Sequence, residues 1–410
     1  FTGSNALDLG AGTATLGLNT NVTTTASTLT VGSITDGVGT RSLSKDGAGT
    51  LAVSGNVTID GNLAVTDGTA AFAGSANNIG GSVTASGTSF TLGASTIGNG
   101  VSVTAGTATM SSANTITGNV AVTGGALTLS GVNNISGTVT VSTGTLNLNA
   151  ANTIAGGLTL TSGTLNIGNT GGFGAGPLII NGGTINNTSG SAMTLSGNPL
   201  QTWGGNYTFT GTNNLNAGTG NVTLAASTQV TVTANNLTEA GVIDDGVSTF
   251  GITKAGAGIL ELGAINTYGG GTAINQGILK FTVNQALTAT TNTLTFGSAA
   301  GTTVGSLDLS TASAIFGGAM VVQTNSASAN TITIGSGQTL RLNGGVTVGA
   351  ATGPTTTRLT VSGAGTLTIG AAGAPTNANV QLGNSATSGQ SNAATWDLTG
   401  LSTFYVNLGS

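Results

Sequence analysis

The segment Asn133-Asn-Ile-Ser-Gly-Thr-Val-Thr-Val-Ser-Thr-Gly-Thr-Leu-Asn-Leu148 decides the fold of this chain. Its apolar pairs Val139/Val141 and Leu146/Leu148 each alternate with a period of two, and the residues between them are small or polar. Such alternation is typical of short strands that bury one face. Glycine separates the two pairs and predicts a turn between them. The segment therefore predicts very short strands joined at tight corners.

The same pattern recurs about every 19 residues on both sides of this segment. Each repeat begins with an isoleucine, and four further apolar positions follow it at fixed distances. A single repeat cannot bury its apolar side chains, but stacked repeats form one continuous core. The predicted core includes Ile79, Ile97, Ile116, Ile135, Ile154, Val120, Val122, Val139, Val141, Leu127, Leu129, Leu146 and Leu148.

The spacing predicts an all-β solenoid with three short strands and three corners in each coil of about 19 residues. Glycines recur between the two apolar pairs, at Gly68, Gly106, Gly125, Gly144 and Gly163, where we expect backbone with positive φ. No long segment keeps a helical period, so helix content should be near zero. At this coil length the chain would form about twenty coils, with looser and longer coils after residue 287.

An asparagine recurs two residues before the leading isoleucine, at Asn77, Asn114, Asn133 and Asn152, with Ser95 in its place once. Stacked asparagine side chains can hydrogen bond to one another along a ladder of strands. The alternative is that each asparagine caps a turn by bonding to its own backbone. Either arrangement is structural, and we expect no ligand at this column.

A family resemblance appears around Lys254-Ala-Gly-Ala-Gly-Ile-Leu-Glu-Leu-Gly263, which is followed by Asn266-Thr-Tyr268, Gly270-Gly-Thr272 and Gly277-Ile-Leu279. This run resembles the autotransporter-associated β-strand repeat of bacterial passenger domains. Lys45-Asp-Gly-Ala-Gly-Thr-Leu-Ala-Val-Ser-Gly55 is similar but has Val57 where the motif has Asn. The resemblance implies a right-handed parallel β-helix at the surface of a bacterial cell or outside it.

The whole chain, residues 1–410, is expected to form one continuous solenoid array. Its most regular coils span 45–170, and irregular coils or an insertion span 171–233, where Trp203 and Tyr207 lie. The family-repeat coil spans 254–281, and longer coils span 287–410. Because the final segment reads as an ordinary strand, we expect the array to continue past Ser410.

Composition excludes several classes of function. Only 4% of the residues are charged and the net charge is -5, so the chain has no basic surface for nucleic acid. It contains neither histidine nor cysteine, which excludes histidine bases, histidine or thiolate metal sites and disulfides. No apolar run approaches the eighteen or so residues that a membrane helix needs. We expect an extracellular or cell-surface protein, secreted by a bacterium.

Clustered acidic residues are the remaining candidates for catalysis or metal binding. Asp244 and Asp245, with Lys254 nearby, are the densest group, and solenoid enzymes that cleave polysaccharides use such carboxylates. The two aspartates precede Gly246 in a predicted turn, so we interpret them as solvated turn residues.

Two weaker sites and three basic residues complete the candidates. Asp60 and Asp67 fall in one coil, as a Ca²⁺ site would require, but no Gly-Asp repeat follows them. Lys45, Lys254 and Arg341 are expected to be solvated or paired with aspartates. Thr107/Thr109 suggests the threonine array of an ice-binding solenoid, but later coils do not keep it. No catalytic, cofactor or metal site is predicted.

The sequence thus favours a non-catalytic structural solenoid in a surface fibre, stalk or filament. Its expected partners are copies of itself, joined end to end or laterally, or further coils of the same chain. The alternative is an adhesin passenger domain that binds host or cell-surface glycans, for which Trp203/Tyr207 is the candidate aromatic cluster. An enzyme acting on polysaccharides and an ice-binding solenoid are minor alternatives.

Overall fold

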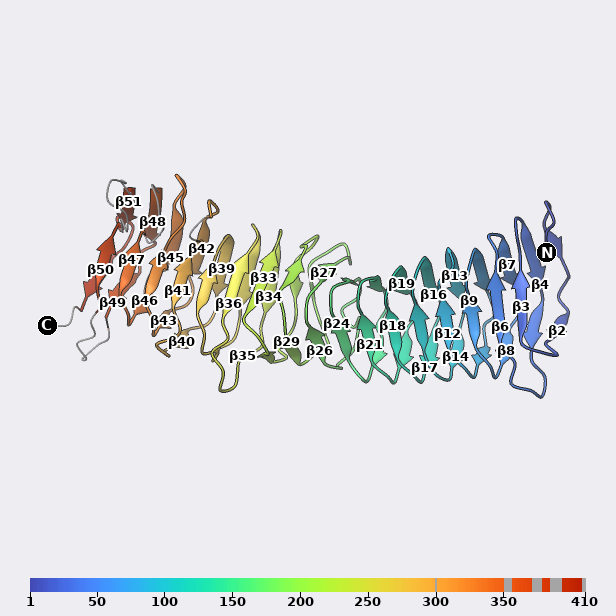
Figure 1. Ribbon diagram of the computed structural model, residues 1–410. Helices are drawn as coiled ribbons and strands as arrows, with labels where there is room; N and C mark the ends of the chain where they lie inside the picture. Colours follow the sequence, from blue (N-terminus) through green and yellow to red (C-terminus); the bar gives the residue numbers. More distant parts are fainter. Residues whose placement is uncertain (299–300, 350–355, 371–377, 384–392, 408–410) are drawn as a thin grey trace. The chain divides into compact units, whose positions relative to one another are not determined.

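The computed structural model describes residues 1–298, 301–349, 356–370, 378–383 and 393–407. Within these ranges all regular secondary structure is β-strand, and the strands pair in parallel (Figure 1). They stack in about 16 turns, which makes the fold a β-solenoid and confirms the predicted class. The number of turns is below the expected twenty because later coils are longer than 19 residues. The chain forms two compact units, Phe1–Leu200 and Gln201–Ser410.

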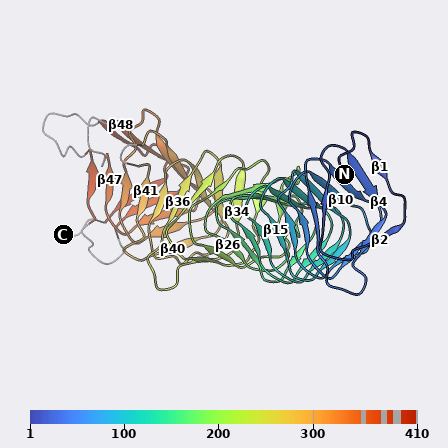
Figure 2. The same cartoon turned by 45° about the vertical axis from the view of Figure 1, so that its right-hand side comes forward.

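Unit 1 has three strands in most coils, one for each face of the solenoid (Figures 1 and 2). Its first face contains β1(Leu7–Asp8), β4(Thr28–Val31), β7(Thr50–Val53), β10(Thr69–Phe72), β13(Ser89–Leu92), β16(Thr107–Met110), β19(Ala126–Leu129), β22(Thr145–Leu148), β25(Thr164–Ile167) and β27(Thr184–Asn187). The second contains β2(Thr13–Thr15), β5(Ser33–Thr35), β8(Val57–Ile59), β11(Asn77–Ile79), β14(Ser95–Ile97), β17(Asn114–Ile116), β20(Asn133–Ile135) and β23(Thr153–Ile154). The third contains β3(Thr20–Thr23), β6(Leu43–Asp46), β9(Leu63–Val65), β12(Val83–Ala85), β15(Val101–Val103), β18(Val120–Val122), β21(Val139–Val141), β24(Leu158–Leu160) and β26(Leu178–Ile180). The remaining strand, β28(Met193–Thr194), follows later in the unit and belongs to none of these three faces.

The register of unit 1 follows the sequence repeat. Paired residues on successive strands of the first face are 18 to 20 positions apart from Thr50 to Thr184. Because identical positions stack, apolar side chains form continuous inward columns. The thirteen residues named above as core are each at most 1% exposed.

Glycine corners serve two purposes in these coils. Gly68, Gly106 and Gly125 have positive φ, as expected. Gly144 and Gly163 do not, but an added Cβ on Gly163 would lie 2.3 Å from the carbonyl oxygen of Gly144 in the preceding coil. These last glycines therefore allow close stacking of the backbone rather than a left-handed turn.

Unit 2 is built from the same kind of parallel ladder. One face contains β30(Tyr207–Phe209), β33(Thr228–Val232), β36(Ile252–Ala255), β38(Thr272–Ile274), β41(Leu294–Phe296), β44(Met320–Val322), β47(Val346–Val348) and β50(Val380–Leu382). A second contains β31(Leu215–Asn216), β34(Asn236–Glu239), β37(Ile259–Leu262), β39(Gly277–Phe281), β42(Gly305–Leu309), β45(Asn330–Ile334), β48(Thr356–Ser362) and β51(Ala393–Asp397). The third begins with β29(Gln201–Trp203), β32(Val222–Leu224) and β35(Ile243–Asp244), and later coils use β40(Gln285–Leu287), β43(Ala314–Phe316), β46(Thr339–Leu342), β49(Thr366–Ile369) and β52(Thr403–Val406).

Coils lengthen along unit 2, as predicted. Paired residues are 19 positions apart between Ile259 and Ile278 but 37 apart between Thr366 and Thr403. The aromatic pair Trp203/Tyr207 lies inside the core, 1% and 4% exposed, with ring centroids 5.3 Å apart. The interpretation of this pair as a surface cluster for adhesion is therefore wrong, because both side chains point inward from β29 and β30. No helix in the described ranges is long and apolar enough to cross a membrane.

Candidate functional site

The most ordered polar side chains of unit 1 form an inward ladder of asparagines. Asn114 Nδ2 donates to Asn133 Oδ1 at 2.8 Å, and Asn133 Nδ2 donates to Asn152 Oδ1 at 2.8 Å. Each also bonds to a backbone carbonyl near its own corner, as Asn152 Nδ2 does to Ala150 O at 2.8 Å. All are at most 3% exposed. The ladder and the turn cap are therefore one arrangement in which the amide joins successive coils and holds its own turn.

The ladder is interrupted at Ser95. The Ser95 hydroxyl is too short to reach the next coil and donates to Gly93 O at 2.9 Å. Asn114 Oδ1 is consequently among the buried side-chain oxygens of the described residues that have no hydrogen-bond partner. On the other side of the gap, Asn77 Oδ1 accepts from Val57 N at 2.9 Å. The interruption therefore leaves one acceptor of the column unsatisfied.

Unit 2 uses a similar rung at the family motif. Asn266 N and Asn266 Nδ2 both donate to Gln285 Oε1 at 3.1 Å, and Gln285 Nε2 donates to Ala264 O at 2.7 Å. Asn266 precedes Tyr268 by two residues, as Asn133 precedes Ile135. This spacing is a signal from which Asn266, which was not predicted as a ladder position, could have been identified as one.

Lys45 lies in β6 and is fully buried, next to the corner that follows this strand. Its Nζ donates to the carbonyl oxygens of Asp46 at 3.0 Å and Gly47 at 2.6 Å in its own coil, and of Asp67 at 3.0 Å in the next coil. All three ammonium hydrogens thus have acceptors, which compensates part of the cost of burying the charge. Burial nevertheless lowers the pKa of Lys45, while Asp67 and Asp46 act to raise it.

Lys254 repeats this arrangement in β36 of unit 2, next to the corner that follows the strand. Its Nζ donates to the carbonyl oxygens of Ala255 at 2.8 Å, Gly256 at 2.7 Å and Gln276 at 3.1 Å. Burial lowers the pKa of Lys254 to about 7. We call these two arrangements the lysine corners. The expectation that both lysines are solvated is wrong, because both are fully buried. Each ammonium bonds to backbone carbonyls, and the aspartates near Lys45 act on it only through their charge. Arg341, in contrast, is half-buried on β46.

A loop of similar design precedes each lysine corner, and the matching residues are 209 positions apart. Asp36 is 7% exposed and accepts from Arg41 N at 3.0 Å, while Asp245 is 5% exposed and accepts from Phe250 N at 2.8 Å. The interpretation of Asp245 as a solvated turn residue is therefore wrong: the turn exists, but the carboxylate supports its backbone from inside. A loop and a lysine corner thus occur once in each unit.

The other predicted acidic residues serve nearby backbone groups. Asp244 accepts from Thr267 Oγ1 at 2.6 Å and from Gly246 N at 2.7 Å, and these hydrogen bonds lower the pKa of Asp244. Asp67 Oδ1 accepts from Gly68 N at 2.7 Å, and Asp60 donates its own N–H to Asp36. Among the described residues no three acidic, histidine or cysteine side chains gather as a metal ligand set.

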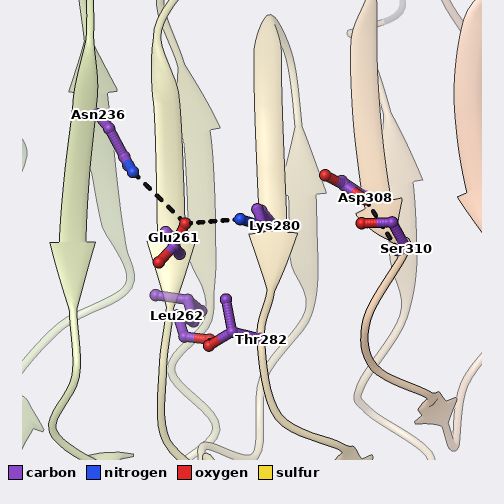
Figure 3. A network of polar contacts seen from close by, with 7 residues as sticks. All are labelled: Asn236, Glu261, Leu262, Lys280, Thr282, Asp308 and Ser310. Atoms are coloured by element: carbon purple, nitrogen blue, oxygen red, sulfur yellow. Dashed lines mark hydrogen bonds and ion pairs between the residues drawn. The ribbon is translucent and has the colours of Figure 1, made fainter.

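Charged side chains meet on the surface of unit 2 along β37, β39 and β42 (Figure 3). Lys280 Nζ lies 3.0 Å from Glu261 Oε2, and Asn236 Nδ2 donates to the same oxygen at 3.4 Å. Asp308 is paired in register with Lys280 on the next strand. The outward side chains Glu261, Lys280 and Asp308 therefore alternate in the sign of their charge from strand to strand. Both partners of the ion pair are partly exposed.

In contrast, residues 68–238 contain no charged side chain at all. From β11 to β23 the second face of unit 1 displays one outward residue per strand, which is exposed and either Thr or Asn. We call this set the outer column; it consists of Asn78, Thr96, Thr115, Asn134 and Thr153. A shallow groove lined by Ala76, Ala94 and Ala113 runs beside its first three members.

Comparison with known proteins identifies the repeat. A family model described as Passenger-associated-transport-repeat matches residues 43–69, 124–148, 143–167 and 252–281. The chain carries passenger-associated-transport repeats. Two of the matches contain the lysine corners, and the other two cover regular coils of the asparagine ladder. The predicted resemblance at Lys254 and Lys45 is thereby confirmed. No curated protein and no solved structure is significantly similar to the chain.

Proposed function

We propose that the chain is a structural segment of a secreted bacterial passenger protein, and that it forms part of a surface fibre or stalk. The observation that carries the proposal is coil-to-coil bonding by buried polar groups, which recurs in both units. The asparagine ladder and the lysine corners each satisfy polar groups of one coil with groups of the next. These buried groups are used to hold the stack together, and they are not exposed to a substrate.

The exposed faces of unit 1 support an association between copies. Charged residues normally keep β-surfaces from associating, and the outer column has none. Its Thr and Asn side chains recur at the strand spacing, so a second copy would present matching groups along the whole column. On the first face, by contrast, Asn166 Nδ2 donates to Asn147 Oδ1 at 2.8 Å, so these amides already bond to each other. The outer column is therefore the favoured lateral contact.

Charge introduced on the outer column tests this proposal. Thr115→Lys with Asn134→Lys should leave the fold intact and dissociate assemblies that the unaltered chain forms. Sedimentation velocity and electron microscopy would measure the assemblies, and the same substitutions at Thr140 and Thr159 on the third face serve as the control. An unaltered chain that remains monomeric at every concentration would contradict the fibre proposal.

The adhesin function is the second candidate, and one observation favours it. Tyr405 on β52 is 58% exposed and is paired in register with Thr368, an outward position of β49, so its ring faces outward, where a glycan could stack on it. A glycan array would test this directly. Binding that is lost in Tyr405→Ala, while the fold persists, would favour the adhesin over the fibre.

We also propose that the segment is not catalytic. Asp244 and Asp245 point to different partners, Thr267 and Phe250, and do not converge on a shared space. Assays against pectin, alginate and chitin-like polymers should show no cleavage. Cleavage that disappears in the double variant Asp244→Asn with Asp245→Asn would overturn this part of the proposal.

A further inference from the structure

Glu239 is a carboxylic acid in the core of unit 2. It lies at the end of β34, its side chain is 1% exposed, and it points inward as Leu237 does. On the next strand its register partner is Leu262, which is also buried. The charge-free segment before it ends at this residue. The acid therefore occupies a position that neighbouring coils fill with an apolar side chain.

Two N–H donors fix the carboxyl group. Gln201 Nε2 donates to Glu239 Oε2 at 2.6 Å, and Gly241 N donates to Glu239 Oε1 at 3.1 Å. Trp203 Nε1 donates to Gln201 Oε1 at 3.1 Å. Because an indole nitrogen can only donate, Trp203 orients the amide of Gln201 so that its NH₂ group faces Glu239. The carboxyl is therefore held by one side chain, that of Gln201, which Trp203 orients, and by one backbone N–H, that of Gly241.

No cation balances this carboxyl within the described residues. The ion pair of unit 2 joins Lys280 to Glu261, and Lys254 donates to three carbonyl oxygens. The titratable group that faces Glu239 is Tyr207 on β30, whose pKa is raised by burial and by the Glu239 charge. Burial raises the pKa of Glu239 to about 8, although the bonds from Gly241 and Gln201 favour the ionised form and lower it.

We propose that Glu239 is a pH-sensitive element of unit 2, neutral in the folded coils below neutral pH and weakening them when it ionises. Ionisation would place an uncompensated charge between Leu262 and the aromatic pair Trp203/Tyr207. The coils that contain β29, β30 and β34 would then open more readily than their neighbours.

The direction of the effect follows from the two pKa values. Glu239 has a pKa of about 8 in the folded chain and 4.5 when exposed, so between these values the folded chain holds a proton that the unfolded chain has lost. The contribution of Glu239 to stability is therefore greatest below pH 4.5 and falls as the pH rises to 8, by up to about tenfold in the unfolding constant per pH unit. Titration of Lys254 changes stability in the opposite direction, because its pKa is lower in the folded chain, and it does so between pH 7 and 10.5. The range from pH 4.5 to 7 thus reports on Glu239.

Hydrogen exchange of the full chain tests the proposal, with rates corrected for the intrinsic effect of pH. In the unaltered chain, protection of peptides covering residues 201–209 and 236–241 should fall by up to about tenfold per unit between pH 5 and 7. Glu239→Gln should remove this slope, and Glu239→Leu provides a second variant that matches the apolar neighbours. The control Glu261→Gln, one coil further and partly exposed, should keep the slope.

Two results would overturn the proposal. One is a slope in Glu239→Gln or Glu239→Leu equal to that of the unaltered chain. The other needs no variant: infrared spectra of the folded protein at pH 6 should contain the band of a protonated buried carboxyl, which disappears as the pH passes 8. Absence of that band at pH 6 would show that Glu239 is already ionised.

Discussion

The coils of residues 68–200 in unit 1 and those of residues 239–309 in unit 2 hold one coil to the next with different chemistry. The first set uses neutral amides, stacked as Asn114, Asn133 and Asn152, and contains no charged side chain. The second also buries the ammonium of Lys254 and the carboxyl of Glu239. Neutral ladders should be insensitive to pH, whereas buried ionisable groups make stability depend on it. We therefore expect the same fold to contain a region whose stability is independent of pH and one whose stability depends on it.

The largest effect is expected from a charge in the neutral coils. Ile135→Asp would bury a carboxylate between Ile116 and Ile154, with no partner designed to receive it. We expect a loss of about 4–5 kcal/mol in the free energy of unfolding. A circular-dichroism melt measures it, and Asn134→Asp on the exposed side of the same strand is the control. An unchanged melt would contradict the inward assignment of the Ile135 column.

Removal of the Lys254 ammonium should cost less. Lys254→Met keeps most of the side-chain volume but leaves three carbonyl oxygens without their donor. We expect a loss of about 3 kcal/mol, since bonds to charged groups contribute most among hydrogen bonds. Urea unfolding measures the loss, and Lys280→Met on the surface is the control. Equal losses in the two variants would show that the lysine corner does not hold the coils together.

Lys254 should also make the stability of unit 2 depend on pH. Its pKa is about 7 in the folded chain and 10.5 when exposed, so the unfolded chain binds the proton more tightly between these values. Stability should therefore rise with pH from 7 to 10.5, and Lys254→Met should reduce the rise to the part that Lys45 contributes. Urea unfolding across this range would measure the slope. A slope in the variant equal to that of the unaltered chain would assign the rise to a group other than Lys254.

The repeat explains why the fold was predictable and the lysine corners were not. Apolar positions such as Ile135 and Val139 recur at a fixed period, and the period alone predicts which side chains point inward. The asparagine column was visible for the same reason. Lys45 and Lys254 occur once in each unit, at positions paired in register with Val65 and Ile274. Composition predicts a lysine to be exposed, and the three carbonyl acceptors that offset its burial are backbone groups, which the sequence does not display.

Glu239 and the aromatic pair were missed for a related reason. Trp203 and Tyr207 interrupt a region where the period was hard to follow, so an insertion at the surface was the simplest interpretation. Their burial depends on register, and Gln201 pairs with Val222 and Tyr207 with Val230 at longer spacings than 19 residues. The position of Glu239 two residues after Leu237 was a usable signal, because a period of two places both on the same side of a strand.

Placing an asparagine at position 95, where the ladder is interrupted by Ser95, should stabilise the neutral coils of unit 1. Ser95→Asn would place an amide beneath Asn114, whose Oδ1 is buried without a partner in the described structure. We expect a gain of about 1 kcal/mol in the free energy of unfolding. Thr96→Asn, exposed on the same strand, is the control and should change little. A loss of stability in Ser95→Asn would show that the ladder does not extend through this coil.

The smallest effect is expected from the surface pair in Figure 3. Lys280 and Glu261 lie 3.0 Å apart, but their side chains are 29% and 19% exposed, so water and salt screen their attraction. Lys280→Gln should therefore reduce the free energy of unfolding by about 0.5 kcal/mol at low salt and by less at high salt. Urea unfolding at two ionic strengths measures this, with Lys254→Gln as the buried counterpart, whose larger loss should not depend on salt. If the Lys280 variant lost as much free energy of unfolding as the Lys254 variant, the alternating row of charges would contribute strongly to the stability of unit 2. Coil-to-coil bonding there would then depend on the surface as well as the core, and the contrast with the uncharged coils of unit 1 would extend to their outer faces.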